Sequence, residues 1–249
     1  VISSEKISVG PPFYQKLIVP FLIPFLLFMS IGPRLKWIKS NIENKNSLII
    51  TFIISVILTF FIIKNLTTEL LFYTILVSVT FFLFFVTLKE FFVRKLNNIS
   101  QTVAHFGFSL LILSILFNSI LSSEIITNIR IGEKYIYDEG KIFFKRIEQK
   151  KESNFNSIIG HFEVRDENGK TVELKPEIRI YNQPVTITSE ADIKTTLLED
   201  KFLVMRLVKG NEYFNIRYQS NPFMIWIWIS VLLLSLGGLM SLFKKKYEK

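Results

Sequence analysis

The stretch Ser100–Ser122, SQTVAHFGFSLLILSILFNSILS, decides the fold of this chain. It carries no carboxylate or ammonium side chain over about one bilayer-length of helix, which predicts a transmembrane helix. It also contains His105, the only histidine in any apolar segment. At a rise of about 1.5 Å per residue, His105 lies roughly 8 Å inside the start of this helix, beneath the lipid headgroups.

His105 shares one face of the expected helix with polar residues. The spacings i, i+4, i+8 and i+11 bring together Gln101, His105, Ser109 and Ile112. Gly107 leaves a gap in which a flat ligand or another helix could pack closely. Two interpretations of His105 stay open on residue type: a metal or haem ligand, or a packing residue that hydrogen-bonds a neighbouring helix.

Four more apolar runs predict further membrane helices. We expect a membrane protein with five transmembrane α-helices, at 17–31, 48–63, 70–88, 100–122 and 222–243. Pro20 and Pro24 are expected to bend the first helix. These five runs contain no Asp or Glu and only the first is broken, which argues against a transporter.

The segment between the fourth and fifth helices has a different pattern. Residues 123–221 predict an external antiparallel β-rich domain, a small sandwich or an open barrel. Two hairpins are expected, one pairing 161–165 with 170–174 across Asn168-Gly169 and one pairing 202–208 with 213–218, with further strands at 141–147 and 178–181. We expect Ser189–Leu198 to be a short helix or a loop. His161 is flanked by charged residues, so we expect it to be solvated rather than a ligand.

The charge of +9 lies in the segments that border the helices. Residues 124–221 have 16 Lys and Arg against 16 Asp and Glu, and the remaining residues have 14 against 5. Basic loops mark the cytoplasmic side, so we expect an external loop at 1–16, a four-helix region at 17–122, an external domain at 123–221 and a cytoplasmic tail at 244–249. This distribution indicates orientation in a membrane and not nucleic-acid binding.

Cysteine is absent from the 249 residues. The chain therefore has no disulfide, no thiolate metal site and no thiol redox chemistry, and a thiol reaction would need a partner's sulfur. The first residue is Val and no signal-peptide n-region precedes Leu17, so we expect the C-terminal part of something longer.

Short motifs occur along the chain in the order of one known family. They are Val9-Gly10-Pro11-Pro12-Phe13, Ile31-Gly32-Pro33, Ala104-His105-Phe106-Gly107, Gly160-His161-Phe162-Glu163-Val164, Lys175-Pro176-Glu177 with Arg179 and Tyr181, Thr188-Ser189-Glu190-Ala191-Asp192-Ile193, Asn221-Pro222-Phe223 with Trp226-Ile227-Trp228, and Leu236-Gly237-Gly238-Leu239. In these motifs the chain resembles the C-terminal part of CcmF, the haem lyase subunit in cytochrome c-type biogenesis.

The resemblance implies a role in cytochrome c maturation. It implies that His105 is one of two axial ligands of an intramembrane b-type haem, and Gln101 and Ser109 are then candidate partners of this ligand. It further implies that haem is taken from the haem chaperone CcmE and joined to the CxxCH thiols of apocytochrome c, with CcmH and CcmI as thiol-handling subunits. The implied location is the bacterial inner membrane, or the mitochondrial inner membrane, with the C-terminus inside.

The sequence also departs from the family pattern. The family's tryptophan-rich haem-handling segment, its two flanking histidines and its second intramembrane ligand are expected upstream, and the three tryptophans here are at 37, 226 and 228. A split gene and a fragment both fit this departure, and the chain is then a non-catalytic half of a haem lyase whose partner is the upstream CcmF region. No catalytic residue is assigned. The alternative function is a structural membrane assembly subunit that docks partners without binding haem.

Overall fold

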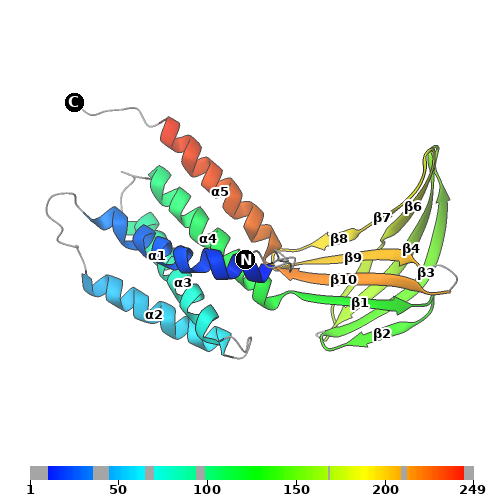
Figure 1. The fold of residues 1–249 in the computed structure, drawn as a ribbon, viewed down its shortest axis with the longest axis horizontal. Helices are drawn as coiled ribbons and strands as arrows, with labels where there is room; N and C mark the ends of the chain where they lie inside the picture. Colours follow the sequence, from blue (N-terminus) through cyan, green and yellow to red (C-terminus); the bar gives the residue numbers. More distant parts are fainter. Residues whose placement is uncertain are drawn as a thin grey trace, which may run out of the picture. The chain divides into compact units, whose positions relative to one another are not determined.

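A computed structural model describes residues 11–35, 45–64, 70–93, 99–167, 169–208 and 212–243. The chain divides into two compact units (Figure 1). The helical unit comprises Val1–Leu116 and Trp226–Lys249, and the sandwich unit comprises Phe117–Ile225. Each unit is described separately below.

Five α-helices lie in the described residues: α1 (Pro11–Ile31), α2 (Lys45–Ile63), α3 (Leu70–Val93), α4 (Ile99–Leu121) and α5 (Met224–Leu242). A short 3-10 turn, Gly32–Arg34, follows α1. The helix α1 begins at Pro11, within the segment expected to be a loop, because proline fits the first turn of a helix. The helix α3 continues five residues past the expected end at 88 and so contains Glu90. The expectation that the helices contain no acidic residue is therefore wrong.

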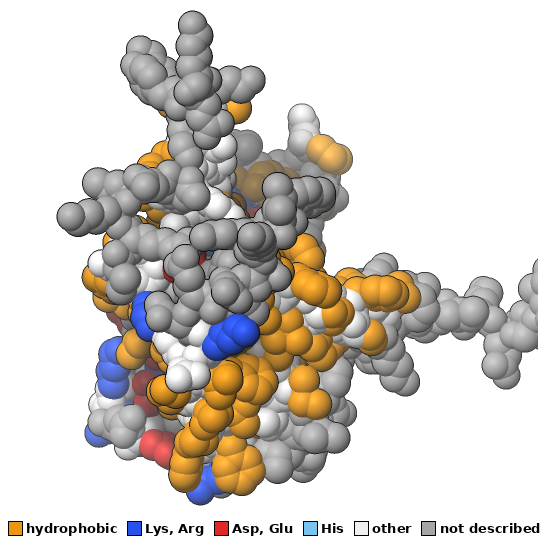
Figure 2. Space-filling view, turned by 90° about the vertical axis from the view of Figure 1, so that its left-hand side faces the viewer, with side chains coloured by type: hydrophobic (Ala, Val, Ile, Leu, Met, Phe, Trp, Pro, Cys, Tyr) orange, Lys and Arg blue, Asp and Glu red, His pale blue; other side chains and the backbone are white. Residues whose placement is uncertain are grey.

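The helices α2, α3, α4 and α5 are each long and apolar enough to cross a membrane. The apolar part of α1, Leu17–Ile31, is shorter, so a fifth span stays a prediction. Large apolar side chains remain exposed on the helices, including Phe21 at 74% and Leu232 at 64%. Figure 2 shows hydrophobic side chains gathered on the face that it presents. Exposed apolar surface of this kind is suited to lipid.

The helix α3 packs against both α1 and α2. Leu26 of α1 and Leu83 of α3 are fully buried in one apolar cluster. Leu48 of α2 and Phe82 of α3 belong to a second cluster. Several buried hydroxyls in these helices bond to their own helix, as where Thr80 Oγ1 donates to the carbonyl oxygen of Leu76 at 2.7 Å, whereas those of Thr59, Thr74 and Ser78 have no hydrogen-bond partner in the described residues. The bonds within each helix satisfy part of the buried polar side chains without charge.

Ten antiparallel strands form two sheets in the described part of the sandwich unit. The strands are β1 (Ser123–Ile129), β2 (Lys134–Tyr137), β3 (Gly140–Lys151), β4 (Phe155–Asp166), β5 (Thr171–Leu174), β6 (Glu177–Asn182), β7 (Val185–Glu190), β8 (Asp192–Thr195), β9 (Glu199–Leu207) and β10 (Phe214–Pro222). One sheet has the order β1-β10-β9-β8, and the other has the order β2-β3-β4-β6-β7, with β5 paired to β4.

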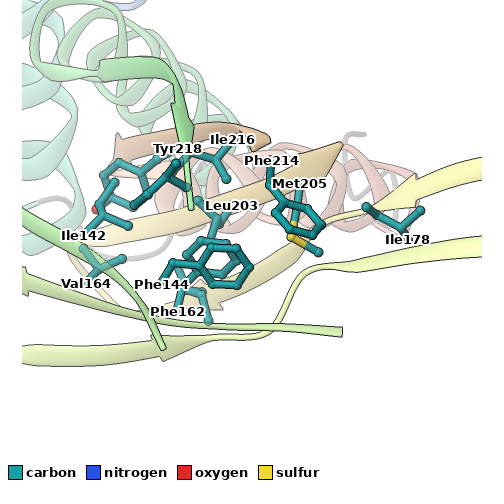
Figure 3. Close-up of a cluster of buried hydrophobic side chains, with 12 residues drawn as sticks. Ile142, Phe144, Phe162, Val164, Ile178, Leu203, Met205, Phe214, Ile216 and Tyr218 are labelled. Atoms are coloured by element: carbon teal, nitrogen blue, oxygen red, sulfur yellow. The ribbon is translucent and has the colours of Figure 1, made fainter. Parts of the chain in front are cut away.

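The core lies between the two sheets (Figure 3). Phe144 of β3 and Phe162 of β4 stack with ring centroids 4.2 Å apart, and Phe214 of β10 meets Phe144 edge-on at 5.3 Å. Leu203 and Met205 of β9 are fully buried beside them. Alternate residues of each strand thus fill one shared core, and of the two expected architectures the sandwich is confirmed.

Both expected hairpins form, but the expectation for residues 189–198 is wrong. Strand β4 pairs with β5, and β9 pairs with β10, as the alternating patterns predicted. Asn168 of the first turn and residues 209–211 of the second lie outside the described residues. Ser189–Leu198 was expected to be a helix or a loop, yet it contains the end of β7 and all of β8. This expectation is wrong because β8 is held by its pairing with β9, a partner that local pattern does not reveal.

Residues at the two ends of the sandwich unit contact each other, at the end of α4 and the start of α5. Asn118 Nδ2, in the last turn of α4, donates a hydrogen bond of 2.8 Å to the carbonyl oxygen of Pro222. The rings of Phe117 and Phe223 lie 5.6 Å apart between centroids. Phe223 has a φ of 60°, a strained conformation for a bulky residue, at the point where β10 gives way to α5. We call these four residues, Phe117, Asn118, Pro222 and Phe223, the junction.

Candidate functional site

His105 lies six residues after the first residue of α4, about 9 Å along the helix axis. Its side chain is half-buried. Within the described chain, no hydrogen-bond partner approaches either ring nitrogen of His105. An imidazole in an apolar helix without such a partner has a nitrogen available to a metal, so the residue fits the role of an axial haem ligand.

Aromatic contacts fix the rotation of α4 on both sides of His105. The ring of Phe106 lies 5.3 Å from that of Phe84 on α3. The ring of Phe108 meets that of Phe25 on α1 edge-on at 5.9 Å. Because both neighbours are held by other helices, the direction in which His105 leaves α4 is set by packing.

The gap at Gly107 is filled by a helix. A Cβ placed on Gly107 would lie 2.9 Å from the backbone nitrogen of Leu234 on α5 and 3.1 Å from the carbonyl oxygen of Ser230. Gly237 of α5 packs in the same way on Ala104 of α4. Of the two possibilities raised for Gly107, a flat ligand or a helix, the structure shows the helix.

Gln101 and Ser109 lie on the same helix face as His105, as expected from their spacing. Ser109 is fully buried, and its Oγ donates to the carbonyl oxygen of Phe106 at 2.8 Å. Gln101 is exposed. The described structure contains no hydrogen bond from either side chain to His105, so their role beside a haem ligand stays a prediction.

Glu90 was missed by the sequence analysis because the third helix was expected to end at 88. It lies near the end of α3 and is close enough to His105 for its charge to act on the imidazole. A third helix predicted to continue through Lys89 and Glu90 would have included this carboxylate. Charged residues often continue a membrane helix at its end. Glu90 is thus the acidic group to consider beside His105.

His161 is not solvated, and that expectation is wrong. Its side chain is in the middle of β4 and only 5% exposed. Nε2 lies 3.1 Å from Oε2 of Glu148 on β3, and Nδ1 lies 3.4 Å from Oε1 of Glu173 on β5. Both ring nitrogens are therefore engaged by carboxylates.

A polar pocket of about 270 Å³ lies in the sandwich unit at the end that leads to the helices. Its lining includes Tyr137, Asp166, Glu199, Lys201, Tyr218 and Ser220. Lys201 is 3% exposed, and its Nζ lies 2.5 Å from Oδ1 of Asp166 and 3.3 Å from Oε1 of Glu199. Two carboxylates compensate this buried ammonium.

Two tyrosine hydroxyls complete this pocket. Tyr137 and Tyr218 are hydrogen-bonded to one another, and burial raises the pKa of both above the ordinary tyrosine value. The hydroxyls therefore stay protonated at neutral pH. Sequence patterns do not reveal this group, because Lys201 and Tyr218 come from β9 and β10 whereas Tyr137 and Asp166 come from the other sheet.

This chain is similar to known proteins. The family model described as the CcmF C-terminal beta-sandwich matches residues 120–222. The cytochrome c-type biogenesis protein CcmF of Escherichia coli strain K12 is 26% identical over 98% of this chain and 39% of its own length. The cytochrome c-type biogenesis protein ccl1 of Rhodobacter capsulatus is 24% identical over 98% of this chain and 39% of its own length.

A solved structure titled cytochrome c heme lyase CcmF has the same fold. It aligns with a TM-score of 0.70 at 18% identity, over 92% of this chain and 40% of its own. The chain thus spans about 40% of the length of the relatives it matches. Together with the four helices of membrane length, these matches describe a multi-pass membrane protein. The chain is thus similar along nearly its whole length to the C-terminal part of CcmF cytochrome c-type biogenesis proteins, and residues 120–222 match the CcmF C-terminal beta-sandwich.

Proposed function

We propose that this chain acts in cytochrome c maturation as the C-terminal part of a CcmF haem lyase, and that His105 provides one axial ligand to an intramembrane b-type haem. The observation that carries the proposal is the half-buried imidazole in α4, which lacks a hydrogen-bond partner in the described structure. A packing histidine would use its ring nitrogens on a neighbouring helix, since an unsatisfied polar group in hydrocarbon is costly. The names of the relatives support the same role.

The chain's own part in this function is to hold and orient one nitrogen. The contacts Phe106–Phe84 and Phe108–Phe25 hold α4 in position on both sides of His105. Metal binding requires the neutral imidazole, because only then does a ring nitrogen carry a free electron pair. A b-type haem bound there would supply electron transfer, which could serve to keep the iron of the substrate haem reduced.

The second axial ligand has to come from another segment or chain. The sequence contains two histidines, and both nitrogens of His161 face carboxylates. We therefore propose the upstream CcmF region as the source of the second imidazole. The same reasoning makes the chaperone CcmE, the thiol-handling subunits CcmH and CcmI, and apocytochrome c partners of the whole assembly, because this chain has no thiol.

The proposed location is the inner membrane of a bacterium or a mitochondrion, with the sandwich unit outside and the C-terminus inside. Its support is the distribution of basic residues. The segments 33–46 and 89–100 contain four and three Lys or Arg, whereas 64–69 contains one.

The test is to purify this chain alone and after co-expression with the upstream CcmF region of a relative. The chain alone should bind haem weakly or not at all, because one imidazole cannot complete a six-coordinate site. The co-expressed complex should show a low-spin b-type spectrum, which His105→Ala removes together with most cytochrome c assembly. His161→Ala is the matched control and should keep the spectrum per molecule of purified protein.

Gln101→Ala and Ser109→Ala extend this test. If these side chains support the ligand, each should shift the haem potential or spectrum less than loss of His105 does. A bis-imidazole spectrum that survives His105→Ala, with no imidazole added, would mean that His105 only packs between helices and that the chain serves as a structural subunit.

A further inference from the structure

Two exposed leucines form the tip of the turn between β8 and β9. Leu197 is 65% exposed and Leu198 is 68% exposed. Thr196 makes this turn rigid, because its Oγ1 donates to the carbonyl oxygen of Glu199 at 2.8 Å and accepts from the backbone nitrogen of Glu199 at 3.1 Å. The two leucines are thus held outward by an ordered turn and are not part of a loose loop.

The leucine turn is bonded to the junction. The backbone nitrogen of Phe223 donates a hydrogen bond of 2.8 Å to the carbonyl oxygen of Leu198. Phe223 is the residue immediately before α5, and its ring contacts Phe117 in the last turns of α4. The turn is therefore fixed to the ends of two helices that are long and apolar enough to cross the membrane.

The hydrogen bond between Phe223 and Leu198 determines where the two leucines lie relative to the membrane surface. The helix α5 begins at Met224, and Trp226 and Trp228 follow within its first five residues. Tryptophan prefers the boundary between lipid headgroups and acyl chains, so the membrane surface lies at the start of α5. A turn that is one hydrogen bond away from residue 223 lies at the same level.

We propose that Leu197 and Leu198 insert into the lipid interface and hold the sandwich unit to the membrane surface at the start of α5. The ligand is the headgroup and acyl-chain boundary of the leaflet in which α5 begins. Insertion removes two apolar side chains from water, which is the driving force for interfacial anchors.

Exposure alone would not support this proposal, as another residue shows. Val185 is 82% exposed at the start of β7, in the turn after β6. It precedes Leu197 by twelve residues of mostly extended chain, a path of up to about 40 Å at roughly 3.3 Å per residue. Val185 is apolar and more exposed than either leucine, but it belongs to the opposite end of the β7–β8 segment, so it is a matched control.

Because the sequence contains no cysteine, a single introduced cysteine can be labelled specifically. Leu198→Cys, Leu197→Cys and Val185→Cys are made separately in the full chain, labelled with a nitroxide and reconstituted in vesicles of phosphatidylethanolamine and phosphatidylglycerol. Collisions of the nitroxide with oxygen, which is enriched in lipid, are compared with collisions with a water-soluble nickel chelate.

The expected result is a ratio of oxygen to nickel collisions that is several-fold higher at 197 and 198 than at 185. Equal ratios at the three positions would place the turn in water and overturn the proposal. Low collision rates with both reagents at 197 and 198 would overturn it as well, because protein would then cover the turn. The two adjacent labels keep the test valid if one variant does not fold.

Discussion

Gly237 of α5 and Ala104 of α4 touch so closely that no side chain fits between them. A Cβ placed on Gly237 would lie 2.6 Å from the backbone nitrogen of Ala104, which is the residue before His105. The next residue, Gly238, has no atom within 4 Å of such a Cβ in the described part of the chain. A methyl group would therefore clash with α4 at Gly237 but not at the adjacent Gly238.

Gly237→Ala should destabilise the helical unit, because the two helices must move apart to admit the methyl group. We expect a cost of about 1–3 kcal/mol, the usual range for overpacking. Gly238→Ala should be neutral or stabilise by up to about 1 kcal/mol, since alanine favours the helix. Thermal unfolding of the purified protein in detergent measures both, and equal midpoints would contradict the close contact.

Lys201→Met should destabilise the sandwich unit by about 3–5 kcal/mol, because it leaves Asp166 and Glu199 facing each other without their buried cation. Lys194→Met is the matched control, since Lys194 is the cross-strand partner of Lys201 but is exposed. The measurement is the urea concentration at which protease begins to cleave the sandwich unit. Equal resistance of both variants to protease would show that the ion pairs of Lys201 do not contribute to the stability of the sandwich unit.

The sandwich unit should lose stability in acid through Glu173. The hydrogen bond to His161 lowers the pKa of Glu173, with a smaller contribution from the charge of Lys175. A carboxyl with a lowered folded pKa contributes stability above its unfolded value of about 4.3, and this contribution disappears as the pH falls through the folded pKa. Unfolding of the full chain, followed between neutral pH and pH of about 3, should show this decline.

Glu173→Gln should flatten this decline because the side chain no longer titrates. Glu212→Gln, at an exposed position, should leave the decline as steep as in the original protein. An unchanged pH profile for Glu173→Gln would show that the contact with His161 contributes nothing to stability.

The proposed orientation can be tested with single cysteines, again because the chain has none. A cysteine that replaces Asn182, the exposed last residue of β6, should react with a membrane-impermeant thiol reagent added outside intact cells. A cysteine that replaces Lys45, at the start of α2, should react only after the membrane is opened. The opposite pattern would reverse the orientation.

Sequence patterns predicted the elements whose stabilisation is local. Apolar runs identified α2 to α5, and alternation identified β4, β5, β9 and β10, because hydropathy and strand period act within each segment. Helix ends were less accurate, as α3 shows by continuing through Lys89 and Glu90. Charged residues at the end of a membrane helix extend it without appearing in a hydropathy pattern.

The surroundings of His161 depend on residues that are distant in sequence. Its neighbours in β4 correctly indicate that it faces away from the core, since Phe162 and Val164 fill the core. However, β4 is an inner strand, and Glu148 and Glu173 from the strands on either side cover its outward face. An outward position is therefore not always a solvated one. The Lys201 pocket was missed for the same reason, because two sheets build it.

The bond between Asn118 and Pro222 also has a consequence for how this architecture arises. The chain leaves α4 and returns to α5 at points joined by a single hydrogen bond of 2.8 Å. In the connectivity of the membrane helices, the whole sandwich unit thus takes the place of an ordinary hairpin loop. Domains whose ends lie so close together can be inserted, removed or exchanged as modules with little effect on the host. A short loop between residues 118 and 222 would therefore keep the same connection between α4 and α5.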